Sequence, residues 1–243
     1  MFILRKKQLA MILCALFVSF SFYLAAENTA KKSFDIKQVS ALPIDSKVIV
    51  IDAGHGRRRW SVLLVPVGID EAELNLKIAL KLQNLLEQSG TTVILTRSDD
   101  TSIYELDKKT LSQKKVSDIK NRVKIGNESG ADIFVSIHMN KIPQTQYDGW
   151  QTFYNVKSEE GKFLAESIQD ALNDTIARKN TRLAKSISNI YIVDHVEIPL
   201  TIVECGFLSN QEELSLLVQD DYQDSLAFGI YTGIINYFKN LGQ

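Results

Sequence analysis

The sequence predicts an α/β fold: a single domain with a mixed, mostly parallel sheet and helices on both of its faces. Short β-branched runs bounded by turn residues alternate along the chain with amphipathic helical patterns, and this alternation is typical of such sheets. The chain has 243 residues, of which 45% are hydrophobic and 23% are charged. These values fit one globular domain with a sizeable core.

The strands are predicted from short apolar runs that are rich in β-branched residues and end at turn signals. The run VIVID comes first, and ADIFVSIHMN and PLTIVECGF are similarly apolar. Near-continuous apolar runs of this kind are expected where both faces of a sheet are covered. The six expected strands cover residues 48–52, 91–97, 131–140, 149–155, 187–193 and 199–207.

The helices are predicted from apolar residues at helical spacing. In the first, Leu74, Ile78 and Leu82 share one face, and Gly90 follows as a stop signal. Gly130 ends the second pattern in the same way. The five expected helices cover residues 71–89, 116–129, 161–180, 210–218 and 222–241.

The N-terminus carries the pattern of an export signal. Three basic residues precede an uncharged, largely apolar run from Gln8 to Ala26. A cut after Ala26 would leave Leu24 at a position where a small residue is preferred, so for residues 1–26 we favour a membrane anchor over a cleaved signal peptide. Residues 27–46 are expected to be a linker, and residues 47–241 a folded domain outside the cytoplasm.

Charge and cysteine content exclude several function classes. The formal net charge of −1 provides no global field that would attract nucleic acid. Cys14 lies in the predicted export segment and cannot pair with Cys205 in the domain. No base lies near Cys205 in the sequence, so we expect a buried small hydrophobic residue and not a catalytic thiol.

Three polar residues accompany the predicted buried strands: His55, His138 and Glu204. Ligands bind beyond the carboxyl ends of the strands in such sheets. Two imidazoles and a carboxylate are typical ligands of catalytic zinc, which lowers the pKa of a bound water towards ~7, and a further carboxylate can act as a general base. A glutamate within an apolar strand is costly unless it has a role. His195, in a loop-like run, is expected to be structural or substrate-side.

Five stretches together resemble a known family. In order, VIVIDAGHG, EAELNLKIALKL, TVILTRSDD, ADIFVSIHMN and IVECGFLSN are similar to motifs of the zinc-dependent N-acetylmuramoyl-L-alanine amidases of the bacterial cell wall. The resemblance covers about residues 47–239. It implies that residues 47–241 are an amidase catalytic domain with one zinc ion, which hydrolyses the amide between N-acetylmuramic acid and L-alanine of the peptidoglycan stem peptide.

The resemblance also implies roles for individual residues. By position, the zinc ligands of the family fall on His55, Glu71 and His138, and its catalytic glutamate falls on Glu204. Three further polar residues are candidates for substrate binding or for bracing loops, and a structural hydrogen bond is favoured for each: Arg97, Arg122 and Asn140.

Further stretches resemble the germination-specific member of this family in endospore formers: SDIKNRV, GWQTFYN, NIYIVDHVEIPLTIVECGFLSN and GIYTGIINYF. This resemblance implies removal of stem peptides in the spore cortex, the step before muramic δ-lactam forms, and a location in the intermembrane space of the forespore. It implies peptidoglycan glycan strands with stem peptides as the partner. Some members of this branch also need an accessory protein to bind zinc well.

One stretch departs from the family pattern. After Gly56 the chain reads RRRWSVLLVPV, Arg57–Val67, where the family usually has a second glycine and an Asp/Gly/Ala-rich loop. Glu71 still lies sixteen positions after His55, so the length is kept while the composition is replaced, which suggests a reading-frame disturbance that was later restored. The alternatives to an active amidase are a catalytically impaired wall-binding or scaffold relative, and a zinc peptidase with another amide substrate.

Overall fold

The computed structural model describes residues 42–56 and 70–241. The predicted signal peptide or membrane anchor, most of the predicted linker and the Arg57–Val67 stretch lie outside these residues. In the part of the chain that the structure describes, no helix is both long enough and apolar enough to span a membrane.

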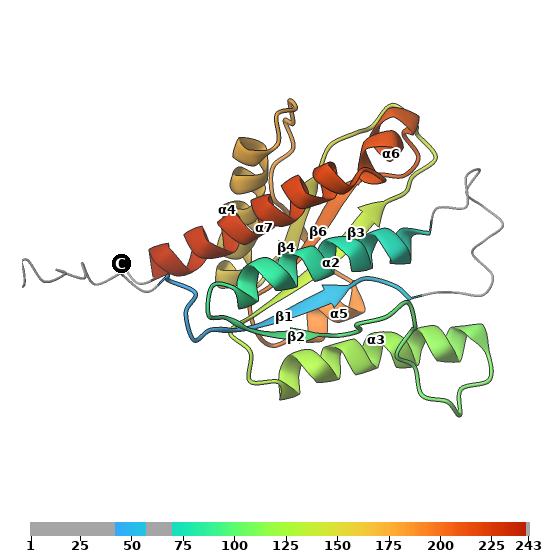
Figure 1. The fold of residues 1–243 in the computed structure, drawn as a ribbon. Coiled ribbons are helices and arrows are strands. Elements are labelled where there is room, and N and C mark those ends of the chain that lie inside the picture. Colours follow the sequence, from blue (N-terminus) through green and yellow to red (C-terminus); the bar gives the residue numbers. More distant parts are fainter. Residues whose placement is uncertain (1–41, 57–69, 242–243) are drawn as a thin grey trace, which may run out of the picture. The chain divides into compact units, whose positions relative to one another are not determined.

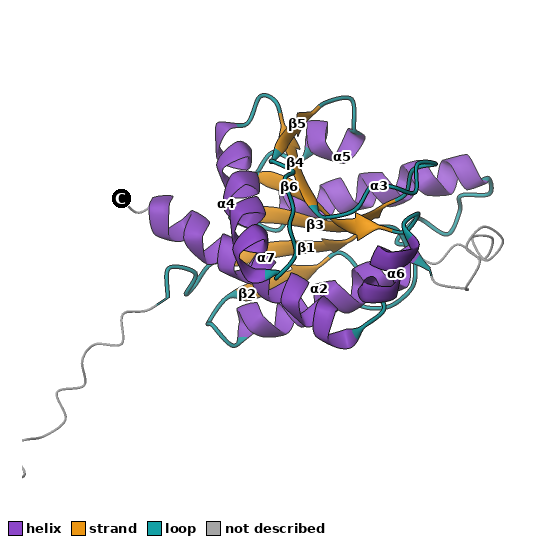
Figure 2. Ribbon diagram, turned by 90° about the horizontal axis from the view of Figure 1, so that it is seen from above, coloured by secondary structure: helices purple, strands orange, loops and turns teal. Residues whose placement is uncertain are grey.

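The described strands form one six-stranded sheet with the order β2-β1-β3-β6-β4-β5 (Figure 2). All neighbouring pairs are parallel except β4 and β6, which are antiparallel. The predicted mixed, mostly parallel sheet is therefore confirmed. The strands are β1 (Val48–Ala53), β2 (Thr92–Leu95), β3 (Ile133–Asn140), β4 (Gln151–Asn155), β5 (Lys185–Ile187) and β6 (Leu200–Phe207).

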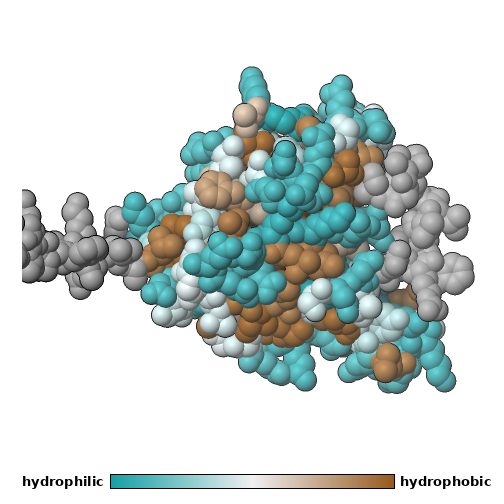
Figure 3. Space-filling model, in the orientation of Figure 1, coloured by the Kyte–Doolittle hydropathy of each residue, from teal (hydrophilic) through white to brown (hydrophobic). Residues whose placement is uncertain are grey.

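Helices cover both faces of this sheet, as predicted (Figure 1). One face carries α2 (Glu71–Glu87), α4 (Glu159–Thr175) and α7 (Asp220–Leu241), and the other carries α3 (Leu111–Glu128) and α5 (Tyr191–His195). The short helix α6 (Gln211–Leu217) follows β6. In the orientation of Figure 1, hydrophobic patches lie between hydrophilic residues on the surface (Figure 3).

The core has two parts because side chains alternate between the two faces of each strand. Ile49 and Ile51 of β1 belong to the larger cluster under α2, α4 and α7. Val50 lies between them and belongs to the smaller cluster, where it is joined by Val123 of α3. Burial on both faces explains why the central strands read as continuous apolar runs.

The predicted strand at 187–193 is wrong. Strand β5 ends at Ile187, and Tyr191–His195 form the helix α5, which adds one helix to the predicted order. Asn189 has a φ of 62°, which interrupts extended backbone. The consecutive residues Ile192 and Val193 are both buried, which suits a helix packed on the sheet but not an alternating strand.

Helices α3 and α4 also differ from the prediction at their ends. Helix α3 begins at Leu111 and not at residue 116, because Thr110 and Gln113 form a capping box that starts the helix earlier. Helix α4 begins at Glu159, after the cap Ser158, and ends at Thr175 and not at residue 180.

Candidate metal centre

His55 lies just beyond the carboxyl end of β1, in a turn that buried polar side chains hold in place. Its φ of 59° is in the left-handed region, which is uncommon for a residue other than glycine. Its carbonyl oxygen accepts a hydrogen bond from Arg122, and the carbonyl of Gly54 accepts bonds from Asn75 Nδ2 (3.0 Å) and Arg97 Nη2 (3.1 Å). Several donors thus fix the backbone that presents His55.

Gly54 allows the turn to approach β3 closely. Its N–H donates to the carbonyl of Ile137 (2.9 Å), which extends the pairing of β1 with β3 by one residue. A Cβ at this position would lie 2.3 Å from the ring of His138. Only glycine therefore fits here without moving that imidazole.

Glu71 is the first residue of α2. The helix begins at this point because the side chain of Asp70 caps it, accepting from the N–H of Ala72 (3.1 Å). Glu71 Oε1 lies 3.2 Å from Nε2 of His55 and 3.4 Å from Nδ1 of His138. One ligand atom from each of these three residues lies within 4.8 Å of the other two. Helix α2 therefore brings a carboxylate to the two imidazoles.

Glu204 lies beside this cluster. It pairs directly with His138 across the parallel strands β3 and β6. Its Oε2 atom is buried and has no hydrogen-bond partner among the described residues. Burial raises the pKa of Glu204 to about 7; His138 opposes this shift and the charge of Glu71 adds to it. Glu204 is thus a carboxyl group that can hold or release a proton near neutral pH.

The pKa values of His138 and Glu71 also follow from this packing. Burial alone would lower the pKa of His138, but the hydrogen bond with Glu71 and the nearby carboxylates of Glu204 and Asp52 raise it. Burial alone would raise the pKa of Glu71, but its contacts with His138 and His55 hold it well below the usual range. Glu71 is therefore ionised, as a metal ligand must be.

Arg97 and Arg122 are each only 3% exposed and bind the backbone of the His55 turn. Arg97 donates to the carbonyls of Ala53 (2.8 Å) and Ala72 (2.7 Å), and so joins the end of β1 to the start of α2. Arg122 donates to the carbonyls of Ala53 and His55. Both arginines thus form structural hydrogen bonds with the backbone of the turn.

Sequence reasoning missed Asp52, which orients one of these arginines. Asp52 is 1% exposed and pairs with Arg122. Burial alone would raise its pKa, but Arg122 and hydrogen bonds from Ser136 and Thr96 hold it at about 2. An aspartate directly after four β-branched residues was a usable signal, because a buried carboxylate needs a partner.

Three other residues singled out from the sequence lie outside the His55–Glu71–His138 cluster. Asn140 ends β3, and its carbonyl accepts from the N–H of Leu208 (2.9 Å). His195 ends α5, where its ring stacks on Tyr191 with centroids 3.9 Å apart. Cys205 is fully buried, and burial raises the pKa of its thiol. The thiol thus stays protonated, as expected for a small hydrophobic residue of the core.

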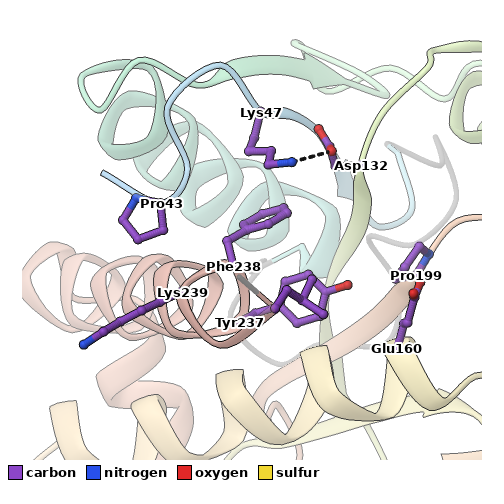
Figure 4. A pocket seen from close by; sticks show the side chains of 9 residues that line it. Pro43, Lys47, Asp132, Glu160, Pro199, Tyr237, Phe238 and Lys239 are labelled. Carbon is purple, nitrogen blue, oxygen red and sulfur yellow. Dashed lines mark hydrogen bonds and ion pairs between the residues drawn. The ribbon is translucent and has the colours of Figure 1, made fainter. Parts of the chain in front are cut away.

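A cavity of about 590 Å³ lies at the amino ends of the central strands (Figure 4). Among its lining residues, Lys47, Asp132 and Pro199 immediately precede β1, β3 and β6. Lys47 and Asp132, which both line it, form an ion pair of 3.1 Å. Since the imidazoles and Glu204 gather towards the carboxyl ends of these strands, this cavity is separate from the candidate metal centre.

Comparisons with known proteins identify the family of this chain. The family model Amidase_3, described as N-acetylmuramoyl-L-alanine amidase, matches residues 49–236. The chain is 38% identical over 202 residues to the germination-specific N-acetylmuramoyl-L-alanine amidase of Bacillus subtilis, covering 83% of this chain and 84% of the relative.

Solved structures show the same fold. The CwlD amidase of Clostridioides difficile, in complex with the GerS lipoprotein, superposes with a TM-score of 0.75 at 40% identity, covering 80% of this chain and all of that one. An N-acetylmuramoyl-L-alanine amidase of Clostridium difficile 630 gives a TM-score of 0.69 at 29% identity, with 80% and 98% covered. These matches confirm the resemblance seen in the sequence motifs, and the chain belongs to the N-acetylmuramoyl-L-alanine amidase family.

Proposed function

We propose that this chain is a zinc-dependent hydrolase that cleaves the amide between N-acetylmuramic acid and L-alanine of the peptidoglycan stem peptide. One observation carries the proposal: Glu71 lies within 3.4 Å of both His55 and His138, beside a buried Glu204 whose Oε2 has no hydrogen-bond partner among the described residues. The family membership of the chain supplies the substrate class.

The donor set fits zinc. Two imidazoles and one carboxylate are a common set of three protein ligands in catalytic zinc sites, which leave a further position for water or substrate. In this chain the ligands would be His55, Glu71 and His138. Zinc bound there would supply Lewis-acid chemistry, polarising a carbonyl and lowering the pKa of water.

Glu204 would do the proton transfer. Its carboxylate takes a proton from the water that attacks the scissile carbonyl, and returns it to the nitrogen of the departing L-alanine as the C–N bond breaks. A raised pKa of about 7 suits a group that must both accept and donate. A cation bound beside it would lower this pKa and so favour the carboxylate that begins the cycle.

The turn and its braces keep the ligands in position. Arg97 and Arg122 bind the backbone on both sides of the turn, so His55 keeps one orientation towards Glu71. Residues that hold the ligands of a metal in this way strongly affect metal affinity. We assign Arg97 and Arg122 to this supporting role.

We further propose that the chain acts on spore cortex, in the step before muramic δ-lactam formation, from outside the cytoplasm in the forespore intermembrane space. The support is its 38% identity to a germination-specific amidase. A relative of known structure is in complex with the GerS lipoprotein, and on this support we propose that an accessory protein binds this chain and aids its zinc binding.

The test combines metal analysis with product analysis. Purified protein loaded with zinc should release stem peptides with a free L-alanine amine from muropeptides, detected by mass spectrometry, and Glu204→Ala should not. Zinc binding without release would favour an impaired wall-binding or scaffold relative, which the departure of residues 57–67 from the family pattern suggests. Release from peptides that lack muramic acid would favour a zinc peptidase.

A further inference from the structure

Three polar residues, His138, Glu204 and Gln151, form a row across β3, β6 and β4, from the candidate metal centre towards the edge of the sheet at β5. Gln151 of β4 faces Glu204 of β6 in the antiparallel ladder, so the two side chains project from the same face. The next residue, Thr152, bonds to Gln169 of α4, on the other face. Gln151 therefore extends the row that His138 and Glu204 begin.

Arg182 lies at the far end of this row. Its Nη1 lies 3.4 Å from Oε1 of Gln151, and its Nε donates to the carbonyl of Asp148 (3.0 Å). Its guanidinium also lies over the rings of Phe207 and Tyr147, 4.7 Å and 5.7 Å from their centroids. Stacking on two rings fixes the plane of a guanidinium while its other N–H groups can still donate.

Arg178, four residues earlier, shows what an arginine with a purely structural role looks like here. It forms ion pairs with Asp148 (3.2 Å) and with the fully buried Glu213 (3.4 Å). Arg182, in contrast, forms no ion pair with any carboxylate within residues 42–56 and 70–241. Arg182 is thus a fixed cation without an anionic partner among the described residues, at the end of the polar row that contains Glu204. Such a cation is suited to bind an anionic group of the substrate.

We propose that Arg182 is a substrate-binding residue that recognises a carboxylate of the stem peptide; this proposal rests on the amidase function proposed above. Strand β4, which carries Gln151, lies roughly 5 Å from the strand that carries Glu204. A substrate peptide in extended conformation advances roughly 3.3 Å per residue. With the length of the Gln151 side chain added, Arg182 would meet a carboxylate on about the second or third residue beyond the scissile amide. Gln151 then acts as the positioning residue for Arg182.

Binding of muramoyl tripeptides tests this proposal without hydrolysis. The zinc-loaded Glu204→Gln chain would be titrated by calorimetry with an N-acetylmuramoyl tripeptide whose carboxylates are free, and with the fully amidated analogue. We expect the free form to bind about tenfold more tightly, the size of one charge-assisted hydrogen bond. Arg182→Gln should remove this preference, and Arg182→Lys should keep only part of it because lysine lacks the planar fork.

Lys179→Gln is the matched control, because it removes one positive charge from an exposed position in the same segment and should leave the preference intact. The proposal is overturned if Arg182→Gln keeps the tenfold ratio, if it weakens both ligands equally, or if the starting protein binds the two forms equally or not at all. Hydrolysis by the unmodified chain is measured separately, so failure of the amidase function and failure of the Arg182 site give different results.

Discussion

Oε1 of Glu71 lies 3.2 Å from Nε2 of His55, although fifteen residues separate them in the chain and thirteen of these lie outside the described residues. Each residue reaches this position from its own element: His55 from the end of β1, and Glu71 from the capped start of α2. The relationship therefore follows from the positions of β1 and α2, whose ends carry the two residues. Since both elements are described and bring the side chains together, we expect the metal centre to form.

Replacing any one of the three candidate ligands should abolish stable zinc binding. A tetrahedral site with only two protein ligands holds the ion much more weakly. We expect the unmodified protein to bind about one zinc ion per chain, and His55→Ala, Glu71→Ala and His138→Ala to bind close to none after dialysis, measured by elemental analysis. His195→Ala is the control, because His195 lies on α5 outside the cluster, and its zinc content should be unchanged. Full zinc retention in Glu71→Ala would contradict the assignment.

Replacing Glu204 should remove activity while leaving the metal in place. Glu204→Gln keeps the shape of the side chain but cannot take a proton, so kcat should fall by about 10²–10⁴-fold, the usual contribution of a general base. Release of stem peptides from muropeptides measures this change. The exposed Glu212 provides the matched control in Glu212→Gln, with kcat expected to stay unchanged. Loss of zinc together with activity in Glu204→Gln would instead make Glu204 a ligand.

His138 and Glu204 could be singled out from the sequence because each carries a strong local signal. His138 and Glu204 stand inside apolar strands, where a polar residue is conspicuous, and the strand pattern places both near one edge of the sheet. The pairing of His138 with Glu204 could not be predicted, because strand order and register depend on packing between distant segments.

Other features lacked a local signal or carried a misleading one. The residues 187–193 have the composition of a strand, yet a positive φ at Asn189 and a buried helical pair follow from tertiary packing that the sequence does not display. The contact of Arg182 with Gln151 joins two residues 31 positions apart and has no motif. Such contacts need the structure, since neither residue type predicts its partner.

A methyl group at Gly54 should weaken zinc binding by displacing His138. The Cβ of Gly54→Ala would lie 2.3 Å from the ring, so either the imidazole or the turn must move. Overpacking of this kind costs about 1–3 kcal/mol of the free energy of unfolding, and we expect zinc affinity to fall as well. Competition with a fluorescent chelator measures the affinity, and urea unfolding measures the stability.

Gly130→Ala separates this effect from the general cost of replacing a glycine. A Cβ at Gly130 would meet no atom within 4 Å, although its φ of 67° makes any side chain unfavourable. We therefore expect about 1 kcal/mol of destabilisation with unchanged zinc affinity. Equal zinc affinity in Gly54→Ala and Gly130→Ala would show that the close approach to His138 does not matter for the metal.

The buried pair of Asp52 and Arg122 should make the stability of the domain depend on pH between about 4 and 2. The pKa of Asp52 is lowered from 3.8 to about 2 in the folded protein, so the unfolded chain binds the proton more readily. The stabilisation from this group is therefore complete above about pH 4 and is lost as the pH falls towards 2. The shift corresponds to about 2 kcal/mol of the free energy of unfolding. Urea unfolding at pH 5, 4 and 3 measures how steeply stability falls.

Asp52→Asn should be less stable at pH 5, because it leaves the guanidinium of Arg122 buried without this carboxylate. Its stability should also fall less steeply between pH 5 and pH 3 than that of the unmodified chain, since the titrating group is gone. Asp107→Asn removes an exposed carboxylate and should keep the original steepness. If Asp52→Asn and the unmodified chain lost stability in parallel over this range, Asp52 would not be the group that links the folding of the His55 turn to pH.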